Sequence, residues 1–223
     1  MSELLEQQMR QLKLGGMAKE WRSIEFHDIE QYVGELLKLE LHEREVNRIN
    51  RMVKSAGFHV LKTLDDFVWN SCIELPVGLT QEYMTDLSFL NAKENLIFMG
   101  TVGTGKTHLA TAIALKACQE GRRVRFFTAA SLANMLLEKN NKGTLNSYLA
   151  SMKKTELIVI DEVGFVPLHK ESAELLFQVI SDCYERRSLI ITSNLEFSQW
   201  NTVFGDNRLT AALIDRLIHH SHI

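Results

Sequence analysis

The eight residues Gly100–Thr107 constrain the fold of this chain more than any other segment. They fit the pattern G-x-x-x-x-G-K-[ST], follow directly on the apolar run Leu96–Met99 and open a stretch with helical periodicity. Glycines in such a loop let backbone N–H groups turn inward around phosphate oxygens, and the N-terminus of the next helix adds a positive dipole. The octet therefore predicts a strand, a phosphate-binding loop and a helix in succession, rather than a chance glycine-rich turn.

The loop also predicts its ligand, ATP with Mg²⁺. Lys106 is expected to reach the β- and γ-phosphates, and the Thr107 hydroxyl is expected to bind Mg²⁺. The residues expected to surround the phosphates are Gly100, Thr101, Val102, Gly103, Thr104, Gly105, Lys106 and Thr107.

A second apolar run, Leu157–Ile160, is followed at once by Asp161 and Glu162. The carboxyl ends of the strands form the edge where open α/β sheets bind ligands. Asp161 is expected to hold Mg²⁺ through water and Glu162 to act as general base. An Asp-Glu pair alone is more often a helix cap, but the phosphate loop about 55 residues earlier favours the catalytic interpretation.

A third apolar run, Leu189–Thr192, ends in Ser193 and Asn194 and brings an amide to the same edge. Asn194 is expected to orient the attacking water or contact the γ-phosphate, although Ser-Asn pairs also form simple turns. From its pattern alone, Arg216 is a helix-surface arginine beside Asp215.

Short apolar runs alternate with amphipathic helical stretches from residue 95 onward, which predicts an α/β fold with a parallel sheet covered on both faces. We expect domains at 1–60 (a small helical module with a break around Gly15-Gly16), 61–94 (a connector) and 95–223 (the core). Two helices are expected in 129–154. The expected strands are Leu96–Met99, Val124–Thr128, Leu157–Ile160, Leu189–Thr192 and one that starts near Ile218.

With these motifs, the chain resembles the IstB-type helper ATPases of bacterial insertion sequences, relatives of DnaC-type helicase loaders in the AAA+ class. The resemblance covers nearly the whole chain. The segments that carry it are Gly100–Ala110, Ile160–Gly164, Thr192–Leu195 with Trp200, and Ala212–Leu217.

The resemblance implies an AAA+ core with a five-stranded parallel sheet, with Asn194 as sensor and Arg216 as an arginine finger for the neighbouring subunit's ATP. It implies a homo-oligomer that grips duplex DNA with ATP bound and recruits a transposase, and whose ATP hydrolysis helps choose or release the target. Many relatives have a proline where this chain has Thr101-Val102. Those positions are expected to bind phosphate through their backbone, so the difference should not harm phosphate binding. Relatives also continue past the last strand, so ending at Ile223 is expected to leave that strand short.

Arg44, Arg48, Arg51 and Lys54 recur at helical spacing and form a basic stripe that could contact DNA phosphates. A solvated face paired with acids such as Glu40 fits the same pattern, and the net charge of −3 gives no global sign of nucleic acid. Residues 128–131 and 139–142 are further candidates for DNA contacts.

No apolar run approaches the ~20 residues needed to span a bilayer, and no signal peptide is evident, so we expect a cytoplasmic protein without a membrane partner. Two other functions fit the same motifs. The chain could load a replicative helicase, or it could be a nucleotide-switched adaptor that hardly turns over ATP.

Overall fold

The computed structural model of this chain describes residues 2–70 and 73–223, which form two compact units, residues up to Arg51 and Met52–Ile223. The domain boundaries expected from the sequence remain a proposal. Within the described residues, no helix is both long and apolar enough to cross a membrane.

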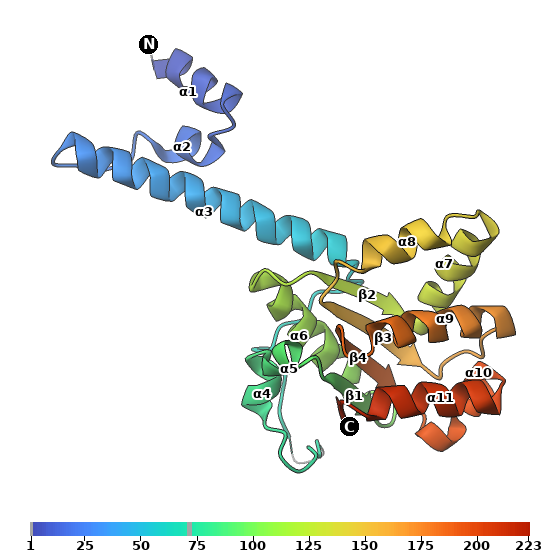
Figure 1. Cartoon of the computed structure of the whole chain (residues 1–223). Coiled ribbons are helices and arrows are strands. Elements are labelled where there is room, and N and C mark those ends of the chain that lie inside the picture. Colours follow the sequence, from blue (N-terminus) through green and yellow to red (C-terminus); the bar gives the residue numbers. More distant parts are fainter. Residues whose placement is uncertain (1, 71–72) are drawn as a thin grey trace. The chain divides into compact units, whose positions relative to one another are not determined.

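The first unit consists of helices (Figure 1). Its elements are α1 (Ser2–Gln11), α2 (Gly15–Glu20) and most of α3 (Ile29–Ala56). The predicted break at Gly15-Gly16 lies slightly earlier, because Lys13 has a φ of 59° and α2 already begins at Gly15. Gly16 lies so close to α3 that a Cβ there would stand 2.6 Å from the Leu39 carbonyl oxygen, so these two helices touch backbone to backbone.

The second unit is built on the predicted five-stranded parallel sheet, in the order β2-β3-β4-β1-β5. The strands are β1 (Asn95–Met99), β2 (Val124–Thr128), β3 (Leu157–Val163), β4 (Ser188–Ser193) and β5 (Ser221–His222). The helices are α4 (Gln81–Thr85), α5 (Ser88–Ala92), α6 (Lys106–Gln119), α7 (Ala129–Asn141), α8 (Leu145–Met152), α9 (Lys170–Cys183), η1 (Phe197–Gln199), α10 (Asn201–Phe204) and α11 (Asn207–Ile218).

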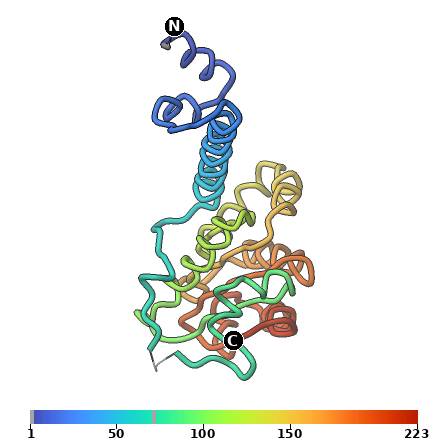
Figure 2. The backbone as a smooth tube through the Cα atoms, turned by 90° about the vertical axis from the view of Figure 1, so that its left-hand side faces the viewer, coloured from blue at the N-terminus to red at the C-terminus, as the bar shows by residue number. Residues whose placement is uncertain are grey.

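Helices cover both faces of this sheet because its strands are apolar on both sides, as parallel strands usually are. One cluster of buried side chains joins the sheet to α6 and to the short α4–α5 region, and the other joins it to α7, α9 and α11. Between α3 and α4, residues 57–70 and 73–80 run beside the core and form no helix or strand (Figure 2). The two helices expected in 129–154 are confirmed as α7 and α8.

The last strand begins at Ser221, not near Ile218 as predicted. Ile218 is instead the end of α11, because the apolar residues Leu213 and Leu217 continue the helical spacing and are buried in the cluster that also contains α9. Asn95 fixes the register of the sheet at this point, since its backbone N–H donates to the His220 carbonyl oxygen at 2.7 Å.

Candidate functional site

The loop between β1 and α6 has the backbone shape that its glycines predict. Gly105 has a φ of 88°, and a Cβ there would come within 3.1 Å of the Phe67 ring, so a side chain would be strained and crowded. Lys106 begins α6, and its ammonium donates to the Thr101 carbonyl oxygen at 2.6 Å and to Thr104 Oγ1 at 3.2 Å. The ammonium therefore lies within the loop itself.

The Asp161 carboxylate is buried at the end of β3, between two hydroxyl groups. Thr107 Oγ1 donates to Asp161 Oδ1 at 2.9 Å, and Thr192 Oγ1, at the end of β4, donates to the same oxygen. Three elements that are far apart in sequence thus meet at one carboxylate oxygen. Thr192 is not among the residues predicted for the site, because a threonine is an ordinary residue in a buried strand.

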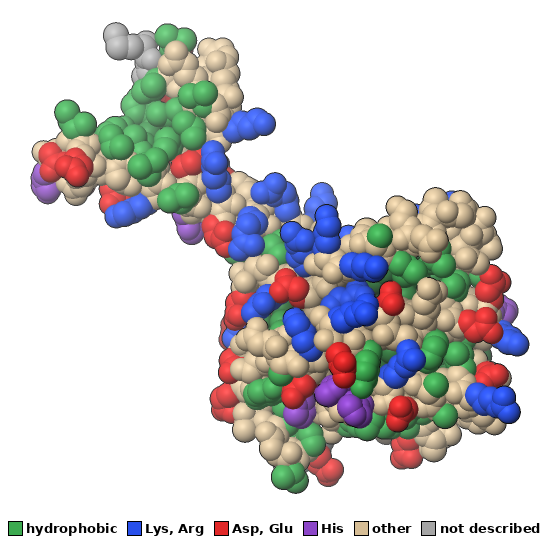
Figure 3. All heavy atoms as spheres, viewed as in Figure 1, with side chains coloured by type: hydrophobic (Ala, Val, Ile, Leu, Met, Phe, Trp, Pro, Cys, Tyr) green, Lys and Arg blue, Asp and Glu red, His purple; other side chains and the backbone are tan. Residues whose placement is uncertain are grey.

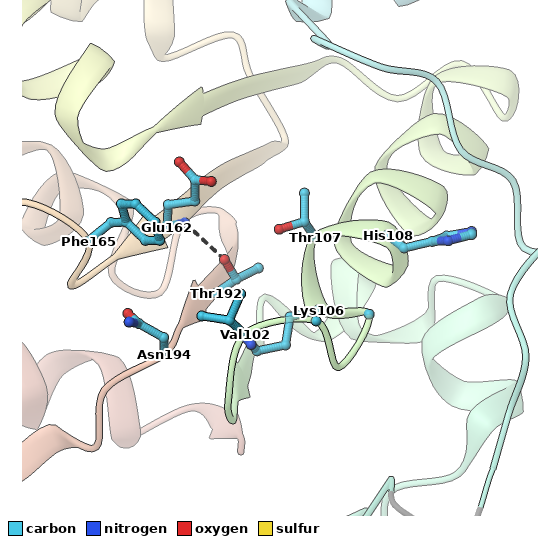
Figure 4. Close-up of a pocket in the computed structure, with 10 residues that line it drawn as sticks. Val102, Lys106, Thr107, His108, Glu162, Phe165, Thr192 and Asn194 are labelled. Carbon is cyan, nitrogen blue, oxygen red and sulfur yellow. Dashed lines mark hydrogen bonds between the residues drawn. The ribbon is translucent and has the colours of Figure 1, made fainter.

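A β-bulge separates Asp161 from Glu162. Ile160 pairs with Ile191 but Val163 pairs with Ser193, so β3 has one residue more than β4 at this point. Glu162 has a φ of 61°, in the left-handed region, and its backbone N–H donates to Thr192 Oγ1 at 2.9 Å (Figure 4). The bulge leaves the Asp161 side chain buried and the Glu162 side chain exposed, and bulges of this kind are common beside active sites.

Asn194 follows β4 and lies at the edge of the pocket (Figure 4). Among the described residues its Oδ1 atom is buried without a hydrogen-bond partner. The residue before it, Ser193, is the centre of a network: its Oγ donates to the Val163 carbonyl oxygen at 2.7 Å and accepts from Trp200 Nε1 at 3.2 Å. This network fixes the backbone from which Asn194 projects.

These elements enclose a pocket of about 170 Å³. Thr107 and Lys106 approach it from the loop side, and Glu162, Thr192 and Asn194 approach it from the strand side (Figure 4). The residues that line it are Val102, Gly103, Gly105, Lys106, Thr107, His108, Glu162, Phe165, Thr192 and Asn194.

A larger hollow, of about 380 Å³, adjoins the same loop and shares Gly105 and Lys106 with the pocket. Its walls are mostly apolar and include Phe67, Leu75 and Leu109. Partial burial lowers the pKa of Lys106 below its ordinary value of 10.5, although the Asp161 carboxylate opposes that change. The loop thus holds a cation that is only partly hydrated between a polar pocket and an apolar hollow.

The oxygen ligands at the pocket fit Mg²⁺. Mg²⁺ is bound in proteins through one or two carboxylates, substrate phosphates and water. The Thr107 hydroxyl and the Asp161 carboxylate are such hard oxygen donors and already lie 2.9 Å apart. A magnesium nucleotide requires such oxygen donors. The residues present therefore suit ATP with Mg²⁺, the ligand predicted from the sequence.

Two groups of predicted residues lie away from the pocket. Arg216, on α11, stacks its guanidinium 5.1 Å from the centre of the Phe177 ring and does not line the pocket. In the basic stripe on α3, Arg44 is ion-paired with Glu40 at 2.7 Å and Arg48 with Glu45 at 2.6 Å. The site is therefore made by the phosphate loop and the ends of β3 and β4.

Comparison with protein families gives one match over nearly the whole chain. A family model described as IstB-like ATP binding protein matches residues 7–223. An insertion sequence IS5376 putative ATP-binding protein from Geobacillus stearothermophilus is 35% identical over 229 residues, covering 100% of this chain and 91% of that protein. An insertion sequence IS232 putative ATP-binding protein from Bacillus thuringiensis subsp. berliner is 36% identical over 198 residues, covering 86% and 78%.

Solved structures give the same fold. A replication initiator DnaA bound to AMPPCP and single-stranded DNA is 25% identical, with a TM-score of 0.55, over 68% of this chain and 47% of that chain. The DnaC helicase loader is 21% identical, with a TM-score of 0.55, over 71% and 93%. The predicted AAA+ core, with its five-stranded parallel sheet and preceding helices, is therefore confirmed.

Proposed function

Because the chain belongs to the family of IstB-like ATP-binding proteins of insertion sequences, we propose that it hydrolyses ATP and that its ATP-bound form assembles on duplex DNA to assist a transposase. The observation that carries the proposal is the meeting of the phosphate loop, Glu162 and Asn194 around one pocket. Nucleotide binding follows from the family, whereas hydrolysis, DNA binding and transposase assistance are the proposed steps.

In the proposed reaction, the backbone N–H groups of the loop and the Lys106 ammonium bind the phosphates of ATP. The ammonium leaves the Thr101 carbonyl oxygen, 2.6 Å away, as it takes up the phosphate. The apolar hollow beside Phe67 is proposed to receive the adenine, because an apolar cavity next to the loop suits a flat aromatic base.

The remaining residues act on the γ-phosphate. Thr107 and Asp161 would hold Mg²⁺, which neutralises charge on the phosphates when bound. Glu162 accepts a proton from the attacking water, and Asn194 orients that water with its otherwise unpaired Oδ1 atom. Arg216 lies outside its own pocket and is proposed to reach the ATP of a neighbouring subunit, which makes the active form a homo-oligomer.

Sedimentation and gel shift with ATP, ADP or no nucleotide test this function directly, on duplex and single-stranded DNA. We expect oligomers on duplex DNA only with ATP, and we expect Arg216→Ala to abolish them. Arg208→Ala, an exposed arginine on the same helix, is the matched control and should assemble normally. A monomer that ignores nucleotide and duplex DNA would overturn the proposal.

The stripe Arg44, Arg48, Arg51 and Lys54 remains a proposed DNA contact. In the structure, two of its arginines would first have to leave Glu40 and Glu45. Pull-down with the cognate transposase, compared with a replicative helicase, distinguishes this function from helicase loading.

A further inference from the structure

A second charged region lies at the edge of the core sheet opposite the pocket. Arg123 immediately precedes β2, Arg125 lies within it, and Lys153 and Lys154 connect α8 to β3. Lys54, in the last turn of α3, belongs to the same compact unit. We call Lys54, Arg123, Arg125, Lys153 and Lys154 the amino-edge basic surface, because β2 and β3 are parallel and both begin here.

These five side chains are exposed. Within residues 2–70 and 73–223, none of them has a carboxylate within ion-pair distance. The neighbouring acid, Glu156, is engaged elsewhere: it pairs with Arg122 at 3.0 Å and accepts from the Arg123 backbone N–H at 3.0 Å. In a chain with three more acidic than basic residues, such a group of uncompensated cations stands out.

The surface is also concave and polar. A hollow of about 200 Å³ opens between the end of α3 and the start of β2, and Arg123, Arg125 and Lys154 line it. Ser55, Ser151 and Thr155 also line it, and the Ser55 and Ser151 hydroxyls donate to the Met52 and Tyr148 carbonyl oxygens. Figure 3 shows Lys and Arg side chains gathered on this part of the core.

The structure holds the arginines in place. The Arg125 guanidinium donates to the Ser55 carbonyl oxygen, which fixes it against the end of α3. The backbone carbonyl oxygen of Arg123 accepts from Glu156 at 2.8 Å and from Leu157 at 3.2 Å, which fixes the base of that side chain. Cations that are already positioned lose less conformational freedom when they bind an anion.

We infer that the amino-edge basic surface binds the phosphate backbone of duplex DNA. This inference rests on the proposed function, in which the protein assembles on duplex DNA. Phosphate contacts in such complexes come largely from arginine and lysine side chains, and Arg123, Arg125 and Lys154 supply them here. Such contacts set position and affinity without reading sequence. Unlike Arg44 and Arg48 of the stripe, these cations need not leave a carboxylate first.

The test uses the full chain with a fluorescent 30-base-pair duplex of random sequence and ATP, between 50 and 200 mM KCl. We expect the double variant Arg123→Glu with Lys154→Glu to bind at least about tenfold more weakly, with a salt dependence lower by about two units, one per lost phosphate contact. Its ATP turnover without DNA should equal that of the wild type. The matched control, Lys170→Glu with Arg208→Glu, also reverses two exposed cations and should bind normally.

Three outcomes count against the inference, and they differ. If the wild type binds the duplex and the double variant binds equally well with the same salt dependence, the inference fails alone. If the wild type does not bind duplex DNA with ATP, the proposed function fails and the inference fails with it. If the double variant binds the duplex as well as the wild type does but no longer binds polyglutamate, which the wild type binds, the surface belongs to an acidic protein partner instead.

Discussion

Among the described residues, Glu40 in the first compact unit and Asp161 in the second are both buried carboxylates, but they are held in different ways. In the first unit, Glu40 accepts from the Gly16 backbone N–H at 2.9 Å and from Arg44 at 2.7 Å, so it ties α2 to α3. In the second unit, Asp161 accepts from the hydroxyls of Thr107 and Thr192, at the pocket. A carboxylate satisfied by backbone and a cation is structural, whereas one held by hydroxyls remains available to a metal.

The units also differ in what their apolar helix faces contact. On α9, Leu176, Val179 and Ile180 are buried in the core cluster beneath the sheet. On α3, Leu37 and Leu41 have the same helical spacing but are 51% and 67% exposed. Periodicity therefore predicts a helix in both units. Burial of the apolar face also requires a surface that the helix packs against, which the sheet provides for α9.

The largest expected effect is on chemistry in the second unit. Glu162→Gln keeps the size of the side chain but removes its capacity to accept a proton, so ATP turnover should fall by about 10² to 10⁴-fold. Nucleotide binding should persist, because the phosphate loop is unchanged. Single-turnover hydrolysis and fluorescent-nucleotide titration measure the two separately. Unchanged turnover would remove Glu162 as the base, whereas a wild type that hardly turns over ATP would favour the nucleotide-switched adaptor.

The next largest effect concerns Thr192, which links Asp161 to the backbone of Glu162. Thr192→Val preserves shape and deletes the hydroxyl, which should cost about 1 to 3 kcal/mol of stability because buried groups lose a partner. Turnover should fall while the Km for ATP changes little. Thr192→Ser restores the hydroxyl and should recover most of the turnover. If the serine variant is as slow as the valine variant, the hydroxyl is not the cause.

A smaller effect is expected in the first unit alone. Gly16→Ala places a Cβ 2.6 Å from the Leu39 carbonyl oxygen and 2.8 Å from Glu43 Cβ, so α2 must shift from α3 at a cost of about 1 to 3 kcal/mol. Hydrogen exchange should accelerate in residues 15–45, with ATP binding unchanged. Gly15→Ala, where a Cβ meets nothing within 4 Å, is the control.

The smallest effect is the acid sensitivity of the first unit. Burial by itself would raise the pKa of Glu40, but hydrogen bonds from Arg44, Gly16 and Met17 outweigh it and lower the pKa below 4.5. The stabilisation from its charge is therefore complete above the unfolded pKa and is lost as pH falls through the folded pKa. The protection factors of residues 15–45, which are exchange rates corrected for the intrinsic effect of pH, should fall on acidification, and Glu40→Gln should flatten that dependence. An identical pH profile in the wild type and in Glu40→Gln would contradict this role of the Glu40 charge.

The predictable parts of the fold and site are those encoded locally. The strands β1, β3 and β4 contain continuous apolar runs, β2 is apolar apart from Arg125 and Thr128, and the loop Gly100–Thr107 combines a fixed pattern with the right flanks. The roles of Thr192 and of the bulge at Glu162 depend on the pairing of β3 with β4, which strand order determines and local sequence does not. The start of β5 was misplaced because helical and strand patterns overlap near Ile218.

The left-handed backbone of Glu162 creates a trade-off between durability and activity. A residue other than glycine in this conformation carries about 1 to 3 kcal/mol of strain. In a variant library ranked by thermal tolerance alone, Glu162→Gly should therefore be enriched, whereas ranking by phosphate release should remove it. Directed evolution of a heat-resistant form would then tend to erase the catalytic group first, unless activity is selected at every round.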